Sequence, residues 1–527
     1  MSRWVMVADL ERCVGCQTCT AACRHANATS PAVQWRKVLD IEAGTYPNVS
    51  RTFVPVGCQH CDDPPCMHVC PTTATRRRVD GIVTIDYDIC IGCAYCDVAC
   101  PYQARFKIDG AHFAYGAAAM QNEIERENPR LYGVAQKCTF CSDRIDFGLA
   151  HGLAPGVDPR ATPACVNACI ADALHFGDID DPDSNVSRLL REQRHFRMHD
   201  ELGTESGFYY LYGKAGGAAE EANPLPQAHG EAGELRSRGV EPWHQQHWDW
   251  KAAGNFICGG MGTGLLLFAA IASIRDGSSS RLAFAALALV ALGLFLVLLK
   301  IGRPMRFIFV LRQPGRSWMT REAWLAAPLF AIGALAAWLQ SALLMIAAAI
   351  LGLLFLFSQA MILREAKGIP TWRSPLIVPL ILATGLAEGS GLFLIATAVL
   401  PPLASMAKVA AVIVALMAAV RAWTWASYLA GLRVEGAPKR AFAVFDWFRP
   451  WFFVLSFVLP TGLIALAFVI ANLATPLFSL AGLCLAGAGA ALKFILVTRA
   501  GYNQGFALAH TPVRGSGVAG PEVKPGW

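Results

Sequence analysis

The segment CIGCAYCDVACP, residues 90–101, decides how the first half of this chain folds. Three cysteines follow one another with two residues between them, and a fourth comes three residues later, directly before a proline. The same cysteine spacing occurs in CVGCQTCTAAC, residues 13–23. Three closely spaced cysteines wrap a short loop around one metal centre, whereas the fourth begins a helical turn that points its thiol toward a neighbouring centre. The spacing therefore predicts pairs of metal centres that exchange one ligand each.

Two further groups complete the pattern: CQHCDDPPCMHVCP, residues 58–71, which also ends in Cys-Pro, and a split group of CTFC, residues 138–141, with CVNAC, residues 165–169. The four groups together hold 16 of the 18 cysteines in the 527-residue chain. The spacing is typical of bacterial [4Fe–4S] ferredoxins, in which the fourth cysteine binds the other cluster. If the middle two groups exchange their fourth ligands, and the outer two do the same, every cluster has a complete set. The sets are Cys13, Cys16, Cys19 and Cys169 (cluster 1); Cys58, Cys61, Cys66 and Cys100 (cluster 2); Cys90, Cys93, Cys96 and Cys70 (cluster 3); and Cys138, Cys141, Cys165 and Cys23 (cluster 4).

Zinc and disulfides fit these cysteines less well. Zinc sites take two pairs of ligands and rarely show three cysteines at this spacing with a fourth close behind. The split group within residues 138–169 would suggest zinc by itself, but not beside the other three. We interpret His25, His60 and His68, which lie within the cysteine segments, as solvated loop side chains. The sequence contains neither a dinucleotide-binding fingerprint nor a P-loop, so we interpret the clusters as an electron wire.

Composition divides the chain into two bodies. Only 16% of the residues are charged and 54% are hydrophobic, whereas soluble domains carry about 25% charged residues. The cysteine groups end at Cys169, and the long apolar runs begin after Trp250. We therefore expect a cluster domain at 1–213, a flexible linker rich in Gly, Ala, Glu and Pro at 214–250, a membrane anchor at 251–500 and a tail at 501–527.

Eight apolar runs are each near the roughly 20 residues that a helix needs to cross a bilayer. An even number of spans returns the C-terminus to the side of the N-terminus. The predicted fold is an α+β ferredoxin-like domain with four [4Fe–4S] clusters, followed by an all-α polytopic membrane bundle of about eight transmembrane helices. The expected spans are 252–274, 282–301, 323–341, 343–363, 376–399, 403–422, 451–471 and 475–496.

Basic residues predict which side of the membrane holds the clusters. Eighteen Lys and Arg residues lie on the cluster side, in segments 300–321, 364–373 and 421–449 and from Lys493 onward, against three on the opposite side. Cytoplasmic loops carry the excess of Lys and Arg. The opening residues contain no apolar signal segment and no twin-arginine pair, which favours a reducing compartment. We therefore expect a multi-pass protein of the inner (cytoplasmic) membrane, with the iron–sulfur domain and the C-terminus facing the cytoplasm.

Four charged residues of the membrane half are candidates for a quinone site. Histidine is missing from residues 251–509, so a bis-histidine haem cannot form there, and electrons are expected to pass directly between a cluster and quinone. Charged residues within spans are functional candidates because their burial in hydrocarbon is costly. Glu388 lies in the glycine-rich string LATGLAEGSGLF, where packing alone is the alternative interpretation. Glu322 lies at the depth where a quinone head group docks; the alternative is a solvated acid at a helix N-terminus. Lys300 and Arg303 complete the set of candidates.

Both halves resemble subunits of one enzyme family. Residues 4–180 resemble the electron-transfer subunits of the DMSO-reductase family of molybdopterin enzymes, on the strength of the four cysteine groups. The membrane half resembles their anchor subunits, of the DMSO-reductase C and NrfD-like type. The strings that carry this second resemblance are LLKIGRPMRFIFVLRQPGRSWMTREAW, GIPTWRSPL and KFILVTRAGYNQGFAL.

The resemblance implies a role and a partner. The chain would be the electron-transfer and quinone-reactive anchor subunit, with membrane lipid and quinone around it and a large molybdopterin-containing catalytic subunit as its partner. It would perform no chemistry on the main substrate. In the anchor family the acid that matches Glu322 belongs to the quinol site. Where some members have a histidine before the Gly-x-Pro segment, this chain has Lys300, which puts a histidine-based proton transfer in doubt.

Four functions remain open at this point. A cluster domain on the cytoplasmic side resembles best the cytoplasmic sulfite dehydrogenases, which send electrons from sulfite to quinone. The alternatives are the anchor of another cytoplasmic dehydrogenase, of the phenylacetyl-CoA:acceptor type, and the anchor of an S- or N-oxide reductase of the DMSO type. An alternative of another class is a redox-driven proton-translocating membrane module. No nucleic-acid partner is indicated.

Overall fold

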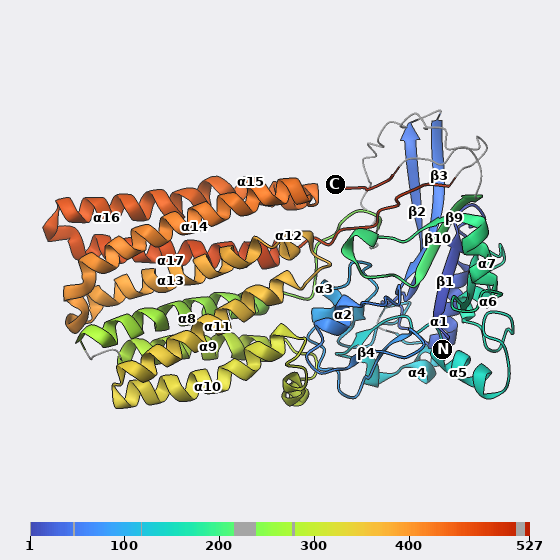
Figure 1. Cartoon of the computed structure of the whole chain (residues 1–527), viewed down its shortest axis with the longest axis horizontal. Helices are drawn as coiled ribbons and strands as arrows, with labels where there is room; N and C mark the ends of the chain where they lie inside the picture. Colours follow the sequence, from blue (N-terminus) through green and yellow to red (C-terminus); the bar gives the residue numbers. More distant parts are fainter. Residues whose placement is uncertain (1, 46–47, 117, 215–238, 277–279, 513–521) are drawn as a thin grey trace. The chain divides into compact units, whose positions relative to one another are not determined.

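The computed structural model describes residues 2–45, 48–116, 118–214, 239–276, 280–512 and 522–527. The chain folds into two compact units, one formed by Met1–Trp243 with Asn503–Trp527 and the other by His244–Tyr502 (Figure 1). The first unit mixes short helices and strands, and the second is helical, as the sequence predicts. Most of the expected linker lies outside the described residues.

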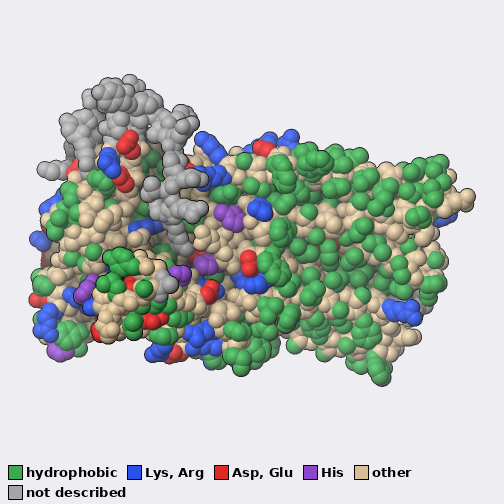
Figure 2. Space-filling model, turned by 180° about the vertical axis from the view of Figure 1, so that it is seen from behind, with side chains coloured by type: hydrophobic (Ala, Val, Ile, Leu, Met, Phe, Trp, Pro, Cys, Tyr) green, Lys and Arg blue, Asp and Glu red, His purple; other side chains and the backbone are tan. Residues whose placement is uncertain are grey.

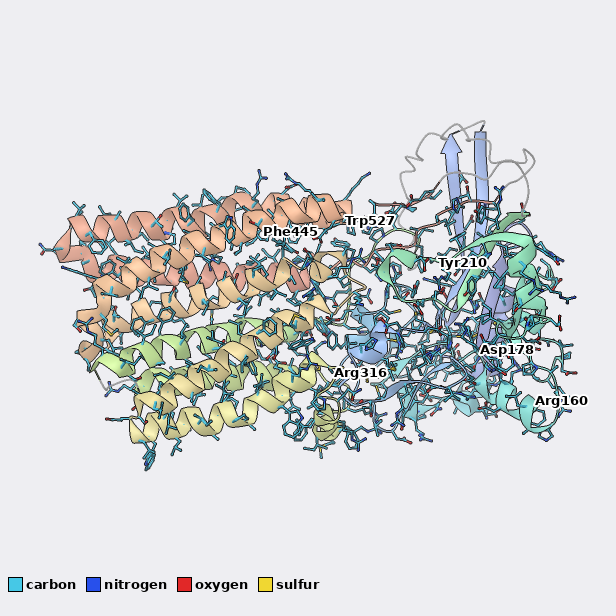
Figure 3. The ribbon with its side chains drawn as sticks, in the orientation of Figure 1. Arg160, Asp178, Tyr210, Arg316, Phe445 and Trp527 are labelled. Carbon is cyan, nitrogen blue, oxygen red and sulfur yellow. The ribbon has the colours of Figure 1, made fainter. Side chains whose placement is uncertain are left out.

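A four-stranded sheet in the order β8–β1–β10–β9 forms the frame of the first unit. The central strands β1 (Trp4–Asp9) and β10 (Phe208–Lys214) are parallel, whereas β8 (Leu174–Asp178) and β9 (Gln193–Phe196) run antiparallel to their neighbours. Alternate residues of β1 enter two different hydrophobic cores, because successive strand side chains point to opposite faces. Tyr210 on β10 and Asp178 at the end of β8 mark this sheet in Figure 3.

Three two-stranded ribbons and seven short helices surround the sheet. The longest ribbon pairs β2 with β3 in continuous register, from Arg36 opposite Gly57 to Thr45 opposite Asn48. The ribbons are β2 (Arg36–Thr45) with β3 (Asn48–Gly57), β4 (Thr75–Arg77) with β5 (Val83–Ile85), and β6 (Phe106–Lys107) with β7 (Ala135–Gln136). The helices are α1 (Thr18–Asn27), α2 (Pro65–His68), α3 (Tyr95–Val98), α4 (Gln121–Arg126), α5 (Ser142–Ala150), α6 (Ala164–Asn167) and α7 (Asn185–Glu192). Five of these helices, α1, α2, α3, α5 and α6, begin within or directly after a cysteine group.

Among the described residues of the helical unit, eight helical segments are long and apolar enough to cross a membrane, which confirms the predicted number. Hydrophobic side chains cover much of its surface (Figure 2). The helices are α8 (Trp250–Asp276), α9 (Ser280–Leu298), α10 (Trp318–Leu339), α11 (Ala342–Arg364), the short α12 (Pro370–Arg373), α13 (Ile377–Val399), α14 (Ala407–Glu435), α15 (Lys439–Phe453), α16 (Leu459–Val469) and α17 (Ala474–Thr498). A π-helical turn, Val454–Val458, joins α15 and α16 into one span.

The ends of the sixth and seventh spans differ from the prediction. Helix α14 continues to Glu435, and α15 begins at Lys439, so the expected loop of almost thirty residues shrinks to three. The orientation argument counted Arg421 and Lys493 as loop charges, and this is wrong, because both side chains are fully buried within helices. The comparison of basic residues in that argument therefore becomes sixteen against three.

Glycines let the backbones of three membrane helices touch. A Cβ added at Gly389 on α13 would lie 2.1 Å from the backbone carbon of Gly264 on α8. A Cβ at Gly391 would lie 2.6 Å from the carbonyl oxygen of Gly482 on α17. Close approach through small residues is a main source of helix association in membranes. The glycines around Glu388 therefore serve the contact of α13 with α8 and α17.

Candidate functional site

Each cysteine group of the first unit has the same backbone kink. The residue before the second cysteine adopts the left-handed conformation in all four groups, with φ of 71° at Gly15, 43° at His60, 67° at Gly92 and 54° at Phe140. This kink turns successive thiols toward the inside of one loop. Glycine takes this conformation without strain, whereas a bulky residue does so only where its surroundings fix it. His60 and Phe140 stack with their ring centroids 3.7 Å apart, which supplies that support.

Cysteines of different sequence groups lie close enough together to interact electrostatically. All sixteen are free of disulfides. Cys66, Cys58 and Cys100 interact with Cys61; Cys93, Cys90 and Cys70 interact with Cys96; and Cys138, Cys165 and Cys141 interact with Cys23. Cys19 interacts most strongly with Cys165 of another predicted set, and then with Cys13 and Cys169. Cys100, Cys70, Cys23 and Cys169 thus each interact with a thiol of another sequence group.

Burial favours the protonated form of these thiols as long as no metal is bound. Desolvation by burial raises the pKa of Cys100 and of Cys138 to about 12. Because ligating cysteines must be deprotonated, assembly of a metal centre here displaces protons. Backbone N–H groups already point at three of the sulfurs, from Thr75 to Cys70 at 3.5 Å, from Phe140 to Cys138 at 3.4 Å and from Ala173 to Cys169 at 3.3 Å.

The donor set suits [4Fe–4S] clusters. Such a cluster needs four thiolates, one for each iron, together with hydrogen-bond donors to its sulfurs. In the described residues, no three His, Cys, Asp or Glu side chains converge on a position for one metal ion, and the thiols of a cubane likewise attach to separate irons. Buried N–H groups of Arg36 lie among the thiols without a hydrogen-bond partner in the described part of the chain. Cluster sulfurs would supply the missing acceptors.

Glu322 lies in a buried cluster of polar side chains in the helical unit. Its side chain, one turn into α10, is 4% exposed, so the interpretation as a solvated acid is wrong. The Gln359 amide of α11 donates to Glu322 Oε1 over 3.0 Å, and the Asn255 amide of α8 donates over 3.3 Å. The amide oxygens of Asn255 and Gln359 have no donor among the described residues. This cluster can therefore accept hydrogen bonds from a ligand with hydroxyl groups.

Lys300 and Arg303 lie near the ends of helices, outside this hydrogen-bonded cluster. Lys300 follows α9, and its ammonium lies 4.9 Å from the ring centroid of Trp248. Trp248 in turn stacks on Trp372, with ring centroids 5.4 Å apart. Arg303 precedes the 3₁₀ turn Pro304–Arg312 and is partly exposed. Both tryptophans are buried, so this stack and its cation stabilise the packing at the ends of these helices.

Glu388 belongs to a second polar cluster, deeper in the bundle. Its carboxylate accepts a 2.6 Å hydrogen bond from the Lys493 ammonium of α17, and neither side chain is exposed. The positive charge of Arg421 on α14 also interacts electrostatically with Glu388. The Arg421 guanidinium donates hydrogen bonds to the Leu485 carbonyl over 2.7 Å and to the Ser456 hydroxyl over 3.0 Å. Two consecutive glycines of α8 lie between the two groups of polar side chains. A Cβ at Gly259 would contact Gln359, and a Cβ at Gly260 would contact Lys493.

Sequence reasoning missed several residues of these sites. Asn255 and Gln359 could have been recognised in the sequence as candidates, since a polar amide inside an apolar run needs a hydrogen-bond partner. His60 is a correction: it is 2% exposed, and its Nδ1 accepts a 3.0 Å hydrogen bond from the backbone N–H of Val83. The pairing of Glu388 with Lys493 depends on which helices are neighbours, and no local pattern reports that.

Two family models match the two units separately. Residues 49–126 match a 4Fe-4S dicluster domain, and residues 251–492 match the DMSO reductase anchor subunit (DmsC). The first half is 41% identical over 222 residues to the B-type subunit of selenate reductase from Mesobacillus selenatarsenatis, a match that covers 40% of this chain and 72% of that protein. The chain belongs to the family of iron–sulfur subunits of molybdopterin oxidoreductases. It joins such a subunit to a DmsC-type anchor domain.

Other relatives in this family are named for different substrates. The iron–sulfur subunit of a putative dimethyl sulfoxide reductase from Halobacterium salinarum is 40% identical over 229 residues, which are 41% of this chain and 80% of that protein. The B-type subunit of sulfite dehydrogenase from Allochromatium vinosum is 37% identical over 228 residues, which are 40% of this chain and 83% of that protein. These relatives share the iron–sulfur half of the chain, whereas the substrates in their names differ; the membrane-anchor half is matched by the DmsC model.

Proposed function

We propose that this chain carries electrons through four [4Fe–4S] clusters between a catalytic molybdopterin subunit and membrane quinone. The observation that carries this proposal is that thiols of different sequence groups lie close enough to interact, Cys61 with Cys100, Cys96 with Cys70 and Cys23 with Cys138. Each cluster, when bound, takes up and releases one electron. The chain's own residues hold the clusters, shield them from water and fix their sequence along the wire.

Electrostatic interactions between thiols of different sets support the order cluster 1, cluster 4, cluster 2, cluster 3 along the wire. Cys19 of cluster 1 is acted on by Cys165 of cluster 4, and Cys138 of cluster 4 is acted on by Cys58 of cluster 2. The Arg105 side chain is enclosed by thiols of clusters 2 and 3. Cluster 1 lies at one end of the wire, and its Cys16 is exposed. Exposed Val14 and Ile170 flank cluster 1, which suits the docking of the catalytic subunit there.

Sulfite is the proposed electron source. The sixteen basic residues on the cluster side favour a cytoplasmic iron–sulfur unit. The relative from a sulfite dehydrogenase adds support at 37% identity, although the selenate and dimethyl sulfoxide reductase subunits are more similar, at 41% and 40%. The direction of flow is thus from sulfite through the clusters to quinone.

Low-temperature EPR of membranes that hold this chain and its partner tests the substrate. Anaerobic sulfite should produce the signals of reduced [4Fe–4S] clusters, and a quinone analogue should abolish them. Phenylacetyl-CoA added in place of sulfite is the matched control and should produce no signal. If sulfite does nothing while an S-oxide reoxidises quinol-reduced clusters, electrons flow the other way and the sulfite assignment is wrong.

The quinone site is proposed at the cluster of Glu322, Asn255 and Gln359. Oxidation of quinol releases two protons, or reduction of quinone takes them up, and a carboxylate in hydrogen-bond reach can exchange them. The two unpaired amide oxygens of this cluster would accept hydrogen bonds from the hydroxyl groups of quinol. Lys300 and Arg303 lie in the same unit, and they are candidates for contact with the quinone ring or its tail.

The Glu322→Gln variant tests this site, because it keeps the shape of the side chain and removes the exchangeable proton. We expect quinone-coupled turnover to fall about 100-fold, the lower end of the effect of a general acid–base group. Iron content and EPR signals should be unchanged. Glu365→Gln, at the partly exposed end of α11, is the matched control and should be fully active. Full activity of Glu322→Gln would refute the placement.

A further inference from the structure

Three fully buried cations lie among the thiols of the iron–sulfur unit. Arg36, Arg105 and Lys137 are each 1% exposed, although a charged side chain is costly to remove from water. Arg105 and Lys137 use their N–H groups within the protein. Arg105 donates to Cys66 over 2.8 Å and to the Thr75 hydroxyl over 3.1 Å, and Lys137 donates to the carbonyls of Val83 and Cys138. Arg36 is different.

The guanidinium of Arg36 is only partly satisfied by the protein. One nitrogen, Nη2, lies 2.9 Å from the sulfur of Met6, and the group lies 5.0 Å from the ring centroid of Phe208. Its Nε and Nη1 have no hydrogen-bond partner among the described residues. An unsatisfied buried donor costs the full desolvation penalty of that group, so native structures rarely keep one without a reason.

The cysteine side chains that interact most strongly with the charge of Arg36 belong to two different predicted sets. They are Cys165, Cys138 and Cys23 of cluster 4, together with Cys19 of cluster 1. A guanidinium stays protonated in proteins, so its positive charge is present whatever the state of the clusters. At this position the charge lies at the junction between the first two members of the wire.

We infer that Arg36 is the shared counter-ion of clusters 1 and 4 and raises the reduction potential of both. Each one-electron reduction adds one negative charge to a cluster, and a nearby buried cation favours that charge. The reduction potential of an iron–sulfur cluster responds to net charge and to hydrogen bonds on its sulfurs. The two free N–H groups of Arg36 provide such hydrogen bonds. This inference rests on the proposed four-cluster assignment, and not on the choice of sulfite or quinone.

A potentiometric EPR titration of the membrane-bound complex tests the inference, because chemical mediators set the potential and no substrate is needed. In Arg36→Gln, the midpoint potentials of clusters 1 and 4 should fall by at least the equivalent of tenfold in the reduction equilibrium, which is about 59 mV for one electron. Clusters 2 and 3 should keep their potentials. Signals are assigned by their loss in Cys16→Ser for cluster 1 and in Cys141→Ser for cluster 4.

Two further variants separate a redox role from a structural one. Arg36→Lys keeps the charge, so its potentials should lie between those of the wild type and Arg36→Gln. Arg51→Gln removes an exposed arginine that pairs with Asp40 on the same hairpin, and it should shift nothing. Unchanged potentials in an Arg36→Gln complex with full iron content would overturn the inference. Loss of the clusters in both Arg36 variants would also contradict it and indicate a purely structural role. An iron content below four clusters per wild-type chain would instead refute the proposed assignment itself.

Discussion

Deletion of residues 503–527 is expected to disrupt the iron–sulfur unit, although it leaves every cysteine and every membrane helix in place. This C-terminal segment belongs to the first compact unit. Phe506 and Leu508 are 1% and 0% exposed, and they pack in the same core as cysteines of the clusters. Removal of a buried Phe costs about 3 to 5 kcal/mol, and a native domain is stable by only about 5 to 15 kcal/mol.

The segment also holds the loop that follows a cluster cysteine. The Gln103 amide donates to the carbonyl of Gly505 over 3.1 Å, and the Gln504 amide donates to the carbonyl of Pro101 over 3.4 Å. Pro101 directly follows Cys100, which is assigned to cluster 2. We therefore expect the deletion to lower iron content and to abolish the signal of cluster 2 first.

Iron analysis and EPR of the full-length chain in membranes, beside the deleted chain, measure this effect. Phe506→Ala is the milder variant and should lower the thermal stability of the iron–sulfur unit while part of the chains keep their clusters. Glu522→Ala changes an exposed residue of the same segment and should leave iron content unchanged. A deleted chain with full iron content and stability would show that these contacts contribute nothing.

The sequence predicts the two units well because their signals are local. Cysteine spacing specifies three of the loops, since the thiols of each are neighbours in the chain, and the kinks at Gly15 and Gly92 follow from the same motif. The fourth group is split between residues 138–141 and 165–169, and the other three groups identify it. Apolar runs predict eight spans because the bilayer sets a minimum length for each. Hydropathy failed at the ends of α14 and α15, where Arg and Trp residues continue the helix beyond the most apolar stretch.

Other features depend on tertiary contacts that no local pattern reports. The segment after α17 carries no recognisable motif of the iron–sulfur unit, yet Phe506 completes its core. Arg36 looks like an ordinary strand residue in the sequence, and its burial among thiols follows only from the pairing of β2 with β3. Lys493 reads as a residue at the end of a span, but its ammonium lies within 2.6 Å of Glu388. The roles of Arg36 and Lys493 follow from the neighbours of their buried charges, and those neighbours are set by the tertiary fold.

Glu388→Gln is expected to be the most damaging single change in the membrane bundle, and more damaging than Lys493→Met. Glu388 is the acidic member of its cluster, whereas Lys493 and Arg421 are both cationic and all three side chains are fully buried. Loss of one partner from a buried ion pair costs about 3 to 5 kcal/mol, because the remaining charge is uncompensated. Glu388→Gln leaves two such cations, while Lys493→Met leaves Glu388 beside Arg421.

The double variant separates charge balance from shape. Adding Lys493→Met to Glu388→Gln should restore part of the lost stability, because Arg421 alone keeps its hydrogen bonds to Ser456 and Leu485. Thermal unfolding of the complex in detergent measures all three variants, and equal losses in the two single variants would refute the asymmetry. Proton movement across sealed vesicles is measured beside quinone turnover. Normal turnover without proton movement in a folded Glu388→Gln complex would favour a redox-driven proton-translocating module; proportional loss of both would assign the ion pair to the stability of the bundle.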